Sequence, residues 1–184
     1  TLTEGKPSVV ESVWDPSITT EDDPSALNLR DVLYALEHRS EHPLALAVCE
    51  SLRGCEDLPV EDFEAVLGKG IAGTVRGRRY YVGNMDLLRD VCGDLPEATN
   101  PMVGDSIGPW MDAGHTVTLL FDKVKVYAVL ALSDELKDTS VQAVKGLSAQ
   151  GIDIHMLPGD NEVAARHIAF VAGIPNVTSH ILPQ

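Results

Sequence analysis

Three short runs of β-type residues between residues 60 and 83 constrain the fold of this 184-residue chain more than any other feature. The runs cover residues 63–67, 71–75 and 79–82, and they are separated by glycines: Gly68, Gly70 and Gly77. Runs this short, divided by glycines, are typical of strands that are joined by tight turns. The sequence therefore predicts an antiparallel meander in this part of the chain.

Helical periodicity lies on both sides of the predicted meander. Before it, apolar residues recur at helical spacing over residues 27–39, and a second helix is predicted to begin at Pro43, because proline suits the first turn of a helix. After it, residues 84–91 are predicted to form a helix that Asn84 caps. A further helix is expected at residues 108–113, and further strands at 8–14, 117–121 and 124–132.

The pattern changes near residues 122–132. The later elements that we expect are a helix over 135–150, a buried strand over 152–157, a turn at Pro158-Gly159-Asp160 and a helix over 162–172. Alternation of strands and helices is typical of a parallel α/β unit. We therefore predict three segments: a link at residues 1–8, an antiparallel α+β domain at 9–122 and an incomplete α/β domain at 123–184.

The chain is strongly acidic, with 28 Asp and Glu residues against 14 Lys and Arg residues and a formal net charge of -14. Such a charge repels phosphate at long range, which argues against a surface for nucleic acid or anionic lipid. Any phosphate ligand therefore needs a local cradle. The apolar runs are too short to cross a bilayer. The three cysteines form no Cys-x-x-Cys pair, and we expect them to be reduced thiols.

Three short motifs in the antiparallel part carry residues that could bind a ligand. They are Ser40-Glu41-His42-Pro43, Gly68-Lys69-Gly70-Ile71 and Tyr81-Val82-Gly83-Asn84. Taken singly, each has a structural interpretation, because a histidine before proline often caps or packs, and Gly-x-Gly between strands is more often a turn than a phosphate cradle. Lys69 could reach a phosphate or could be an ordinary solvated lysine in a turn.

Together the three motifs offer the groups that a purine nucleotide requires. A purine needs a flat apolar slot with polar groups at its edge, whereas phosphates need backbone N–H groups that glycines leave accessible. The imidazole of His42 can stack on a base and also hydrogen-bond. Glu37, on the preceding predicted helix, could accept a hydrogen bond from an exocyclic amine.

These residues, in this order, resemble the nucleotide-binding domain of heavy-metal (type IB) P-type ATPases. The resemblance extends along the chain. Thr1-Leu2-Thr3-Glu4-Gly5-Lys6-Pro7 is similar to the end of the family's DKTGTLTEGKP segment, Ser133-Asp134-Glu135-Leu136-Lys137 to its Asp-x-x-Lys segment, and Gly159-Asp160-Asn161 to its Thr-Gly-Asp-Asn turn. It implies that residues 9–122 form a nucleotide-binding domain, an antiparallel sheet flanked by helices. Residues 123–184 would be part of a haloacid-dehalogenase-like Rossmannoid phosphorylation domain.

The resemblance also implies the roles of individual residues. An ATP pocket in the first domain would be formed by Glu37, His42, Gly68, Lys69, Gly70, Gly83 and Asn84. Asp134, Gly159 and Asp160 would lie near the centre of phosphoryl transfer and the magnesium ion. The expected ligand is ATP with Mg²⁺. The other expected partners are the membrane helices, the actuator domain and the rest of the phosphorylation domain of one metal-exporting pump, of which this chain would be a cytoplasmic part; no nucleic acid is expected.

The sequence departs from the family pattern in two ways. The aspartate that such pumps phosphorylate would lie upstream of Thr1, so we expect no catalytic residue within the chain and no turnover by the chain alone. Pro158 stands where the family has threonine, which removes a hydroxyl and a backbone N–H. Two other functions stay open: a soluble phosphatase of the haloacid dehalogenase type, which would need an Asp-x-Asp nucleophile motif, and a non-catalytic module of the same fold.

Overall fold

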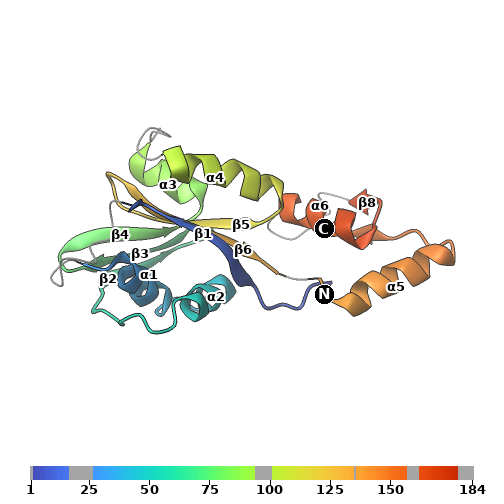
Figure 1. The fold of residues 1–184 in the computed structure, drawn as a ribbon, viewed down its shortest axis with the longest axis horizontal. Coiled ribbons are helices and arrows are strands. Elements are labelled where there is room, and N and C mark those ends of the chain that lie inside the picture. The colour runs from blue at the N-terminus through green and yellow to red at the C-terminus, as the bar shows by residue number, and fades with distance from the viewer. Residues whose placement is uncertain (1, 17–26, 94–100, 135, 157–161, 178–184) are drawn as a thin grey trace.

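In the computed structural model, six strands form one antiparallel sheet in the order β1-β6-β5-β4-β3-β2 (Figure 1). The structure describes residues 2–16, 27–93, 101–134, 136–156 and 162–177. The strands of the sheet are β1 (Ser8–Trp14), β2 (Glu61–Val66), β3 (Gly70–Val75), β4 (Arg78–Gly83), β5 (Thr116–Phe121) and β6 (Val126–Ser133). The meander predicted between residues 60 and 83 is confirmed as β2, β3 and β4, which pair in sequence order.

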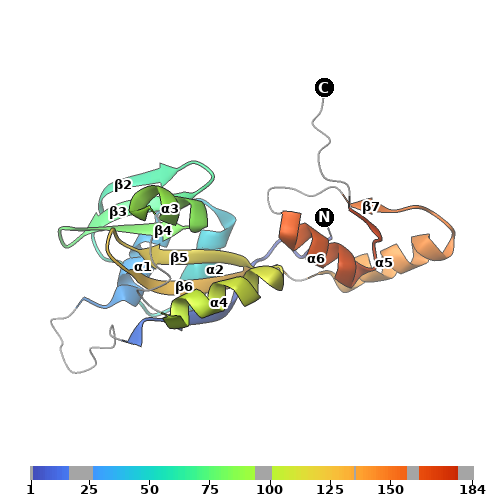
Figure 2. The same cartoon turned by 90° about the horizontal axis from the view of Figure 1, so that it is seen from above.

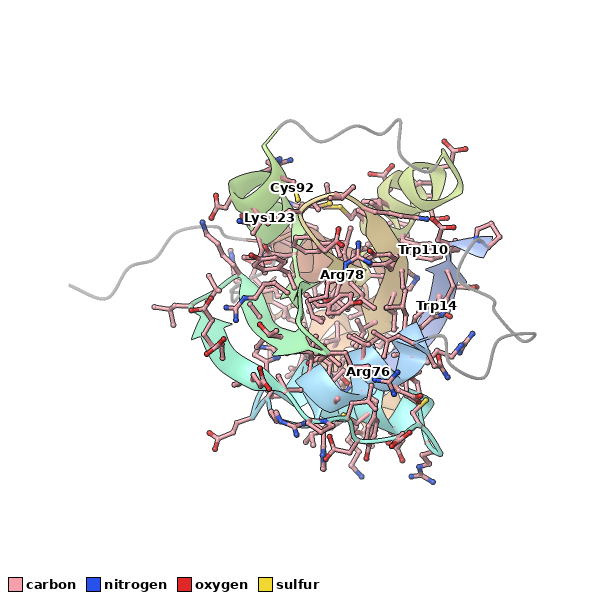
Figure 3. The ribbon with its side chains drawn as sticks, turned by 90° about the vertical axis from the view of Figure 1, so that its left-hand side faces the viewer. Trp14, Arg76, Arg78, Cys92, Trp110 and Lys123 are labelled. Carbon is pink, nitrogen blue, oxygen red and sulfur yellow. The ribbon has the colours of Figure 1, made fainter. Side chains whose placement is uncertain are left out.

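Helices cover both faces of this sheet (Figure 2). The helices on one face are α1 (Leu29–Glu37) and α2 (Pro43–Ser51), and those on the other are α3 (Met85–Cys92) and α4 (Pro101–Asp112). Alternation along β4 serves both cores, because Tyr80 and Val82 pack with α1 and α2 whereas Tyr81 packs with α3 and α4. Figure 3 shows the sheet end-on between these two helical layers.

The helix predicted at residues 108–113 begins earlier, at Pro101, and contains Pro109 in its interior. Gly104 disfavours a helix before residue 108, which is consistent with the shorter prediction. Ile107 and Trp110, however, pack against the core between α3, α4 and the sheet. Partial burial of these two side chains stabilises the longer helix against its unfavourable local sequence.

Strand β6 belongs to the sheet, although the sequence interpretation assigns residues 123–133 to the later segment. It pairs with β1 on one side and with β5 on the other. Its apolar composition is typical of a strand buried on both faces, and periodicity does not distinguish a central antiparallel strand from the first strand of a parallel unit. The sheet therefore extends to Ser133, and the later elements follow it.

The later elements form a smaller unit beyond the sheet: α5 (Asp138–Ala149), β7 (His155–Met156), α6 (Glu162–Ala172) and β8 (Asn176–Val177). The parallel pairing of β7 with β8 agrees with the predicted α/β pattern. The buried strand predicted over 152–157 is too long. Ile152 is 48% exposed and lies outside β7, because the partner strand β8 pairs with only two residues.

Two segments connect the sheet with the smaller unit, and we call their described residues, 2–7, 134 and 136–137, the connecting ribbon (Figure 1). Thr3 forms an antiparallel bridge with Leu136. The N–H of Lys137 donates to the carbonyl of Leu2 at 3.0 Å. The two segments are therefore bonded to each other where they leave the sheet.

The backbones of β3 and β4 meet closely where Gly70 is paired with Gly83. A methyl group on Gly83 would lie 2.3 Å from the carbonyl oxygen of Lys69 and 2.7 Å from Cδ2 of Leu87. Gly70 has a φ of 152°, a conformation that L side chains rarely adopt. Glycine at both positions lets Leu87 of α3 pack directly on the strand backbones.

Replacing Gly83 with alanine should lower the free energy of unfolding by about 1–3 kcal/mol, because the backbone atoms it would meet cannot move aside cheaply. Gly108→Ala in α4 is the matched control, since its added methyl meets nothing within 4 Å. That control should be neutral or stabilising by about 0.5–1 kcal/mol. Urea unfolding followed by circular dichroism measures both, and equal effects would contradict the close-approach interpretation.

Candidate functional site

The strand directions place Gly70 and Gly83 toward the end of the sheet from which the chain continues into the smaller unit, here called the junction end. β6 finishes there with Ser133, and the antiparallel β5 begins there. β4 runs antiparallel to β5 and finishes at Gly83, opposite Leu119. Gly70 opens β3 directly opposite Gly83. Both glycines therefore face the same side of the molecule as the connecting ribbon.

Helix α1 crosses the face of the sheet from β1 to β3. At its start, the Arg30 guanidinium lies 4.6 Å from the ring centroid of Trp14, the last residue of β1. Near its end, Leu36 lies beside Gly73 of β3, because a methyl group on Gly73 would meet Cδ2 of Leu36 at 2.7 Å. Glu37, the last residue of α1, therefore lies near β3, the strand that Gly70 opens.

Glu37 is a buried carboxyl group, 7% exposed. Burial raises the pKa of this carboxyl from 4.5 to about 7. Among the residues that the structure describes, none donates a hydrogen bond to the Glu37 carboxylate. In turn, the Glu37 charge helps to raise the pKa of the Cys49 thiol on α2 to about 11, behind burial of that thiol. A largely buried carboxylate with no protein donor can accept a hydrogen bond from a ligand.

His42 caps α2. Its Nδ1 accepts a hydrogen bond from the N–H of Leu44 at 3.2 Å, and its own N–H donates to Oγ of Ser40 at 3.3 Å. The capping role that the sequence offers as one interpretation is therefore confirmed. Because Nδ1 accepts, a neutral ring carries its proton on Nε2. The side chain is exposed, so one face of the ring can still receive a base; that contact stays a prediction.

Lys69 forms an ion pair with Asp90 of α3. The hydrogen bond and the charge of Asp90 raise the pKa of Lys69. The lysine is thus neither unpaired in a turn nor free for a phosphate, and a phosphate would have to compete with Asp90. Sequence analysis does not single out Asp90, because an acidic residue on the exposed side of an amphipathic helix is ordinary.

Asn84 confirms the predicted cap of α3 and makes a further contact. Its Oδ1 accepts from the N–H groups of Asp86 at 3.1 Å and Leu87 at 3.0 Å. Its Nδ2 donates to the carbonyl of Gly68 at 3.1 Å. Its backbone N–H donates to the carbonyl of Lys69 at 2.9 Å. Asn84 therefore joins α3 to the turn formed by residues 68–70.

Of the residues predicted near phosphoryl transfer, the structure places Asp134 in the connecting ribbon. Its Oδ1 accepts from the N–H of Lys6 at 3.2 Å. Gly159 and Asp160, like Pro158, lie outside the described residues. Within the described ranges, no group of three or more His, Cys, Asp or Glu side chains could hold a metal ion.

The chain matches the family of haloacid dehalogenase-like hydrolases over residues 1–182 and belongs to that family. Within it, curated relatives are heavy-metal P-type ATPases. The copper-exporting P-type ATPase B of Archaeoglobus fulgidus is 34% identical over 186 residues, which cover 100% of this chain and 25% of that protein. The probable copper-importing P-type ATPase A of Enterococcus hirae is 30% identical over 188 residues, covering 100% of this chain and 24% of its own length.

Solved structures agree. A zinc-transporting PIB-type ATPase is 28% identical with a TM-score of 0.69, over 100% of this chain and 28% of that one. The catalytic domain of the CPx-ATPase CopB-B shares the fold, with a TM-score of 0.61 over 100% of this chain and 58% of that one at 20% identity. The resemblance drawn from the motifs is therefore confirmed, and the chain spans about a quarter of the first curated relatives. No helix in the described ranges is long and apolar enough to cross a membrane.

The raised pKa of Glu37 makes the free energy of unfolding depend on pH. Because the folded pKa lies above the unfolded one, the stability linked to this proton is fully present below pH 4.5 and is lost as the pH rises to about 7. Glu37→Gln removes this dependence. The free energy of unfolding of the variant minus that of the wild type should therefore rise between pH 4.5 and pH 8, by about 3 kcal/mol at most. Urea unfolding between pH 4.5 and 8 measures it.

The exposed Glu41, four residues further on, is the control. Glu41→Gln should leave the shape of the pH profile unchanged. If the difference between wild type and Glu37→Gln stays constant across this range, Glu37 does not titrate as burial requires.

Proposed function

We propose that this chain is the ATP-binding part of a heavy-metal cation-transporting P-type ATPase and that it binds adenine nucleotide near the glycines of β3 and β4. One observation carries the proposal. Glu37, a largely buried carboxyl group, ends the helix whose Leu36 packs beside β3, the strand that Gly70 opens, and the exposed ring of His42 caps the next helix. These are the groups that a purine with attached phosphates requires.

Each residue has a distinct part in the proposed complex. The Glu37 carboxylate would accept from the exocyclic amine of adenine, and the His42 ring would stack on the base. The turn of Gly68 and Gly70 would let phosphates approach the backbone closely. Gly83 would act indirectly, because it permits the close backbone approach beneath α3. Lys69 would reach a phosphate only after leaving Asp90.

In the whole pump, we propose that the bound ATP passes its γ-phosphoryl group to an aspartate upstream of Thr1, and that this step drives metal export. The curated relatives, of which the chain spans about a quarter, are named as ATPases that transport copper or cadmium. Mg²⁺ would arrive on the phosphates of ATP, where it neutralises their charge. The chain would then be a cytoplasmic domain that works with membrane helices, an actuator domain and the rest of the phosphorylation domain.

His42→Asn tests the nucleotide site. Asparagine keeps an acceptor for the N–H of Leu44, so the cap on α2 survives while the imidazole is lost. Binding of ADP, measured by calorimetry and by amide shifts in NMR, should weaken about tenfold or more, in line with a stacking contribution of about 1–3 kcal/mol. His155→Asn, which removes an exposed imidazole from β7, should bind as the wild type does.

Two results would oppose the proposal. If wild-type protein binds no adenine nucleotide, the chain is better described as a non-catalytic module of the same fold. If it hydrolyses p-nitrophenyl phosphate with Mg²⁺, it behaves as a soluble phosphatase of the haloacid dehalogenase type.

A further inference from the structure

The side-chain amide of Asn84 hydrogen-bonds both to α3 and to the turn of residues 68–70. Its oxygen accepts from two backbone N–H groups of the helix. The nitrogen is used by the turn, where the carbonyl of Gly68 accepts from it. The backbone N–H of Asn84 donates to the carbonyl of Lys69, the next residue of the turn. Two successive peptide groups of the turn are therefore bonded to a single residue.

These bonds fix the direction of the peptide groups in the turn. In a planar trans peptide, the carbonyl and the following N–H point in opposite directions. With the carbonyls of Gly68 and Lys69 directed at Asn84, the N–H groups of Lys69 and Gly70 are directed away from it. The N–H of Lys69 meets the carbonyl of Val66 at 2.9 Å, as this orientation requires.

The turn has glycines on both sides of Lys69. Gly68 has a φ of 69° and Gly70 a φ of 152°, and a glycine backbone passes easily between conformations. The ion pair of Lys69 with Asp90 is a weak tie, since the two side chains are 37% and 55% exposed and water screens their attraction. The bond from the N–H of Lys69 to Val66 and the pairing of Gly70 hold the turn to β2 and β3, and Asn84 is the residue that holds it to α3.

We infer that Asn84 is a positioning residue, which holds the Gly68–Gly70 turn in the geometry that receives the nucleotide and does not itself contact the nucleotide. This role rests on the proposed function, because it concerns the same site. It differs from the role that the family resemblance implies for Asn84, which is a place in the wall of the pocket. The difference is measurable, since a positioning residue changes the turn before any ligand is present.

Asn84→Ser separates the two functions of the side chain. Serine caps a helix about as well as asparagine, so α3 should persist, but it has no amide group to donate to Gly68. The matched control is Asn28→Ser, because Asn28 caps α1 in the same way, with Oδ1 accepting from the N–H of Arg30 at 3.0 Å. Asn84→Asp also keeps the cap and loses the donor, and it serves if the serine variant does not fold.

Hydrogen exchange without ligand is the first measurement. In Asn84→Ser, the amides of Lys69 and Asn84 should exchange roughly three to ten times faster than in wild type, the factor that loss of one hydrogen bond gives. The amide of Leu88, within α3, should change little. In Asn28→Ser, the turn should exchange as in wild type.

Titration with ADP is the second measurement. Affinity should fall roughly three- to tenfold in Asn84→Ser and stay unchanged in Asn28→Ser. At saturation, the amide shifts near Glu37 and His42 should match those of the wild-type complex. Weaker binding with an unchanged turn would overturn the inference, because Asn84 would then contact the nucleotide directly. A loosened turn with unchanged affinity would overturn it too, whereas a wild-type protein that binds no ADP would instead remove the proposed function.

Discussion

The close approach of two strand backbones at Gly70 and Gly83 is the constraint on which the rest of the candidate site depends. No side chain separates the strands from Leu87 there, so α3 lies low on the sheet. That position brings Asn84 within hydrogen-bond distance of the turn of residues 68–70. A side chain on either glycine would lift α3 and part these groups. The two glycines thus matter because they let α3 pack closely on the strands, as well as for the space that they leave for a ligand.

The electrostatics of the site differ from those of the chain as a whole. A net charge of -14 repels an anionic ligand at long range. Within the site, however, burial leaves the Glu37 carboxyl partly protonated near neutral pH, because its pKa is raised to about 7. The group therefore offers an acceptor without a full negative charge. Lys69 is paired with Asp90, so the cradle that we propose for phosphate in the turn of residues 68–70 would rely on backbone groups more than on a cation.

Local signals in the sequence were sufficient where a residue type sets the backbone. Glycines divide the meander, Pro43 opens α2 and Asn84 caps α3, and all three predictions are confirmed. Predictions failed where tertiary packing decides. Partial burial of Ile107 and Trp110 favours a helix α4 that begins as early as Pro101, and pairing with β1 places β6 in the sheet. Neither contact leaves a local pattern in the sequence.

For the site, the sequence indicated candidate residues and not what each one contacts. The place of Glu37 depends on how α1 packs across the sheet, from Arg30 over Trp14 to Leu36 beside Gly73. The burial of Glu37 and the ion pair of Lys69 are long-range contacts that spacing along the chain does not show. Whether these residues bind nucleotide stays a prediction for the variants to test.

The connecting ribbon limits how the sheet can move against the smaller unit. A single flexible linker lets the bodies it joins turn about its bonds in any direction. Here two segments leave side by side and are bonded to each other through Thr3 and Leu136, and again through Leu2 and Lys137. A two-stranded connection of this kind resists twisting and bends most easily across its flat face. Displacement of the sheet against the smaller unit would therefore follow one preferred arc, and any group held on the sheet would move along that arc with it.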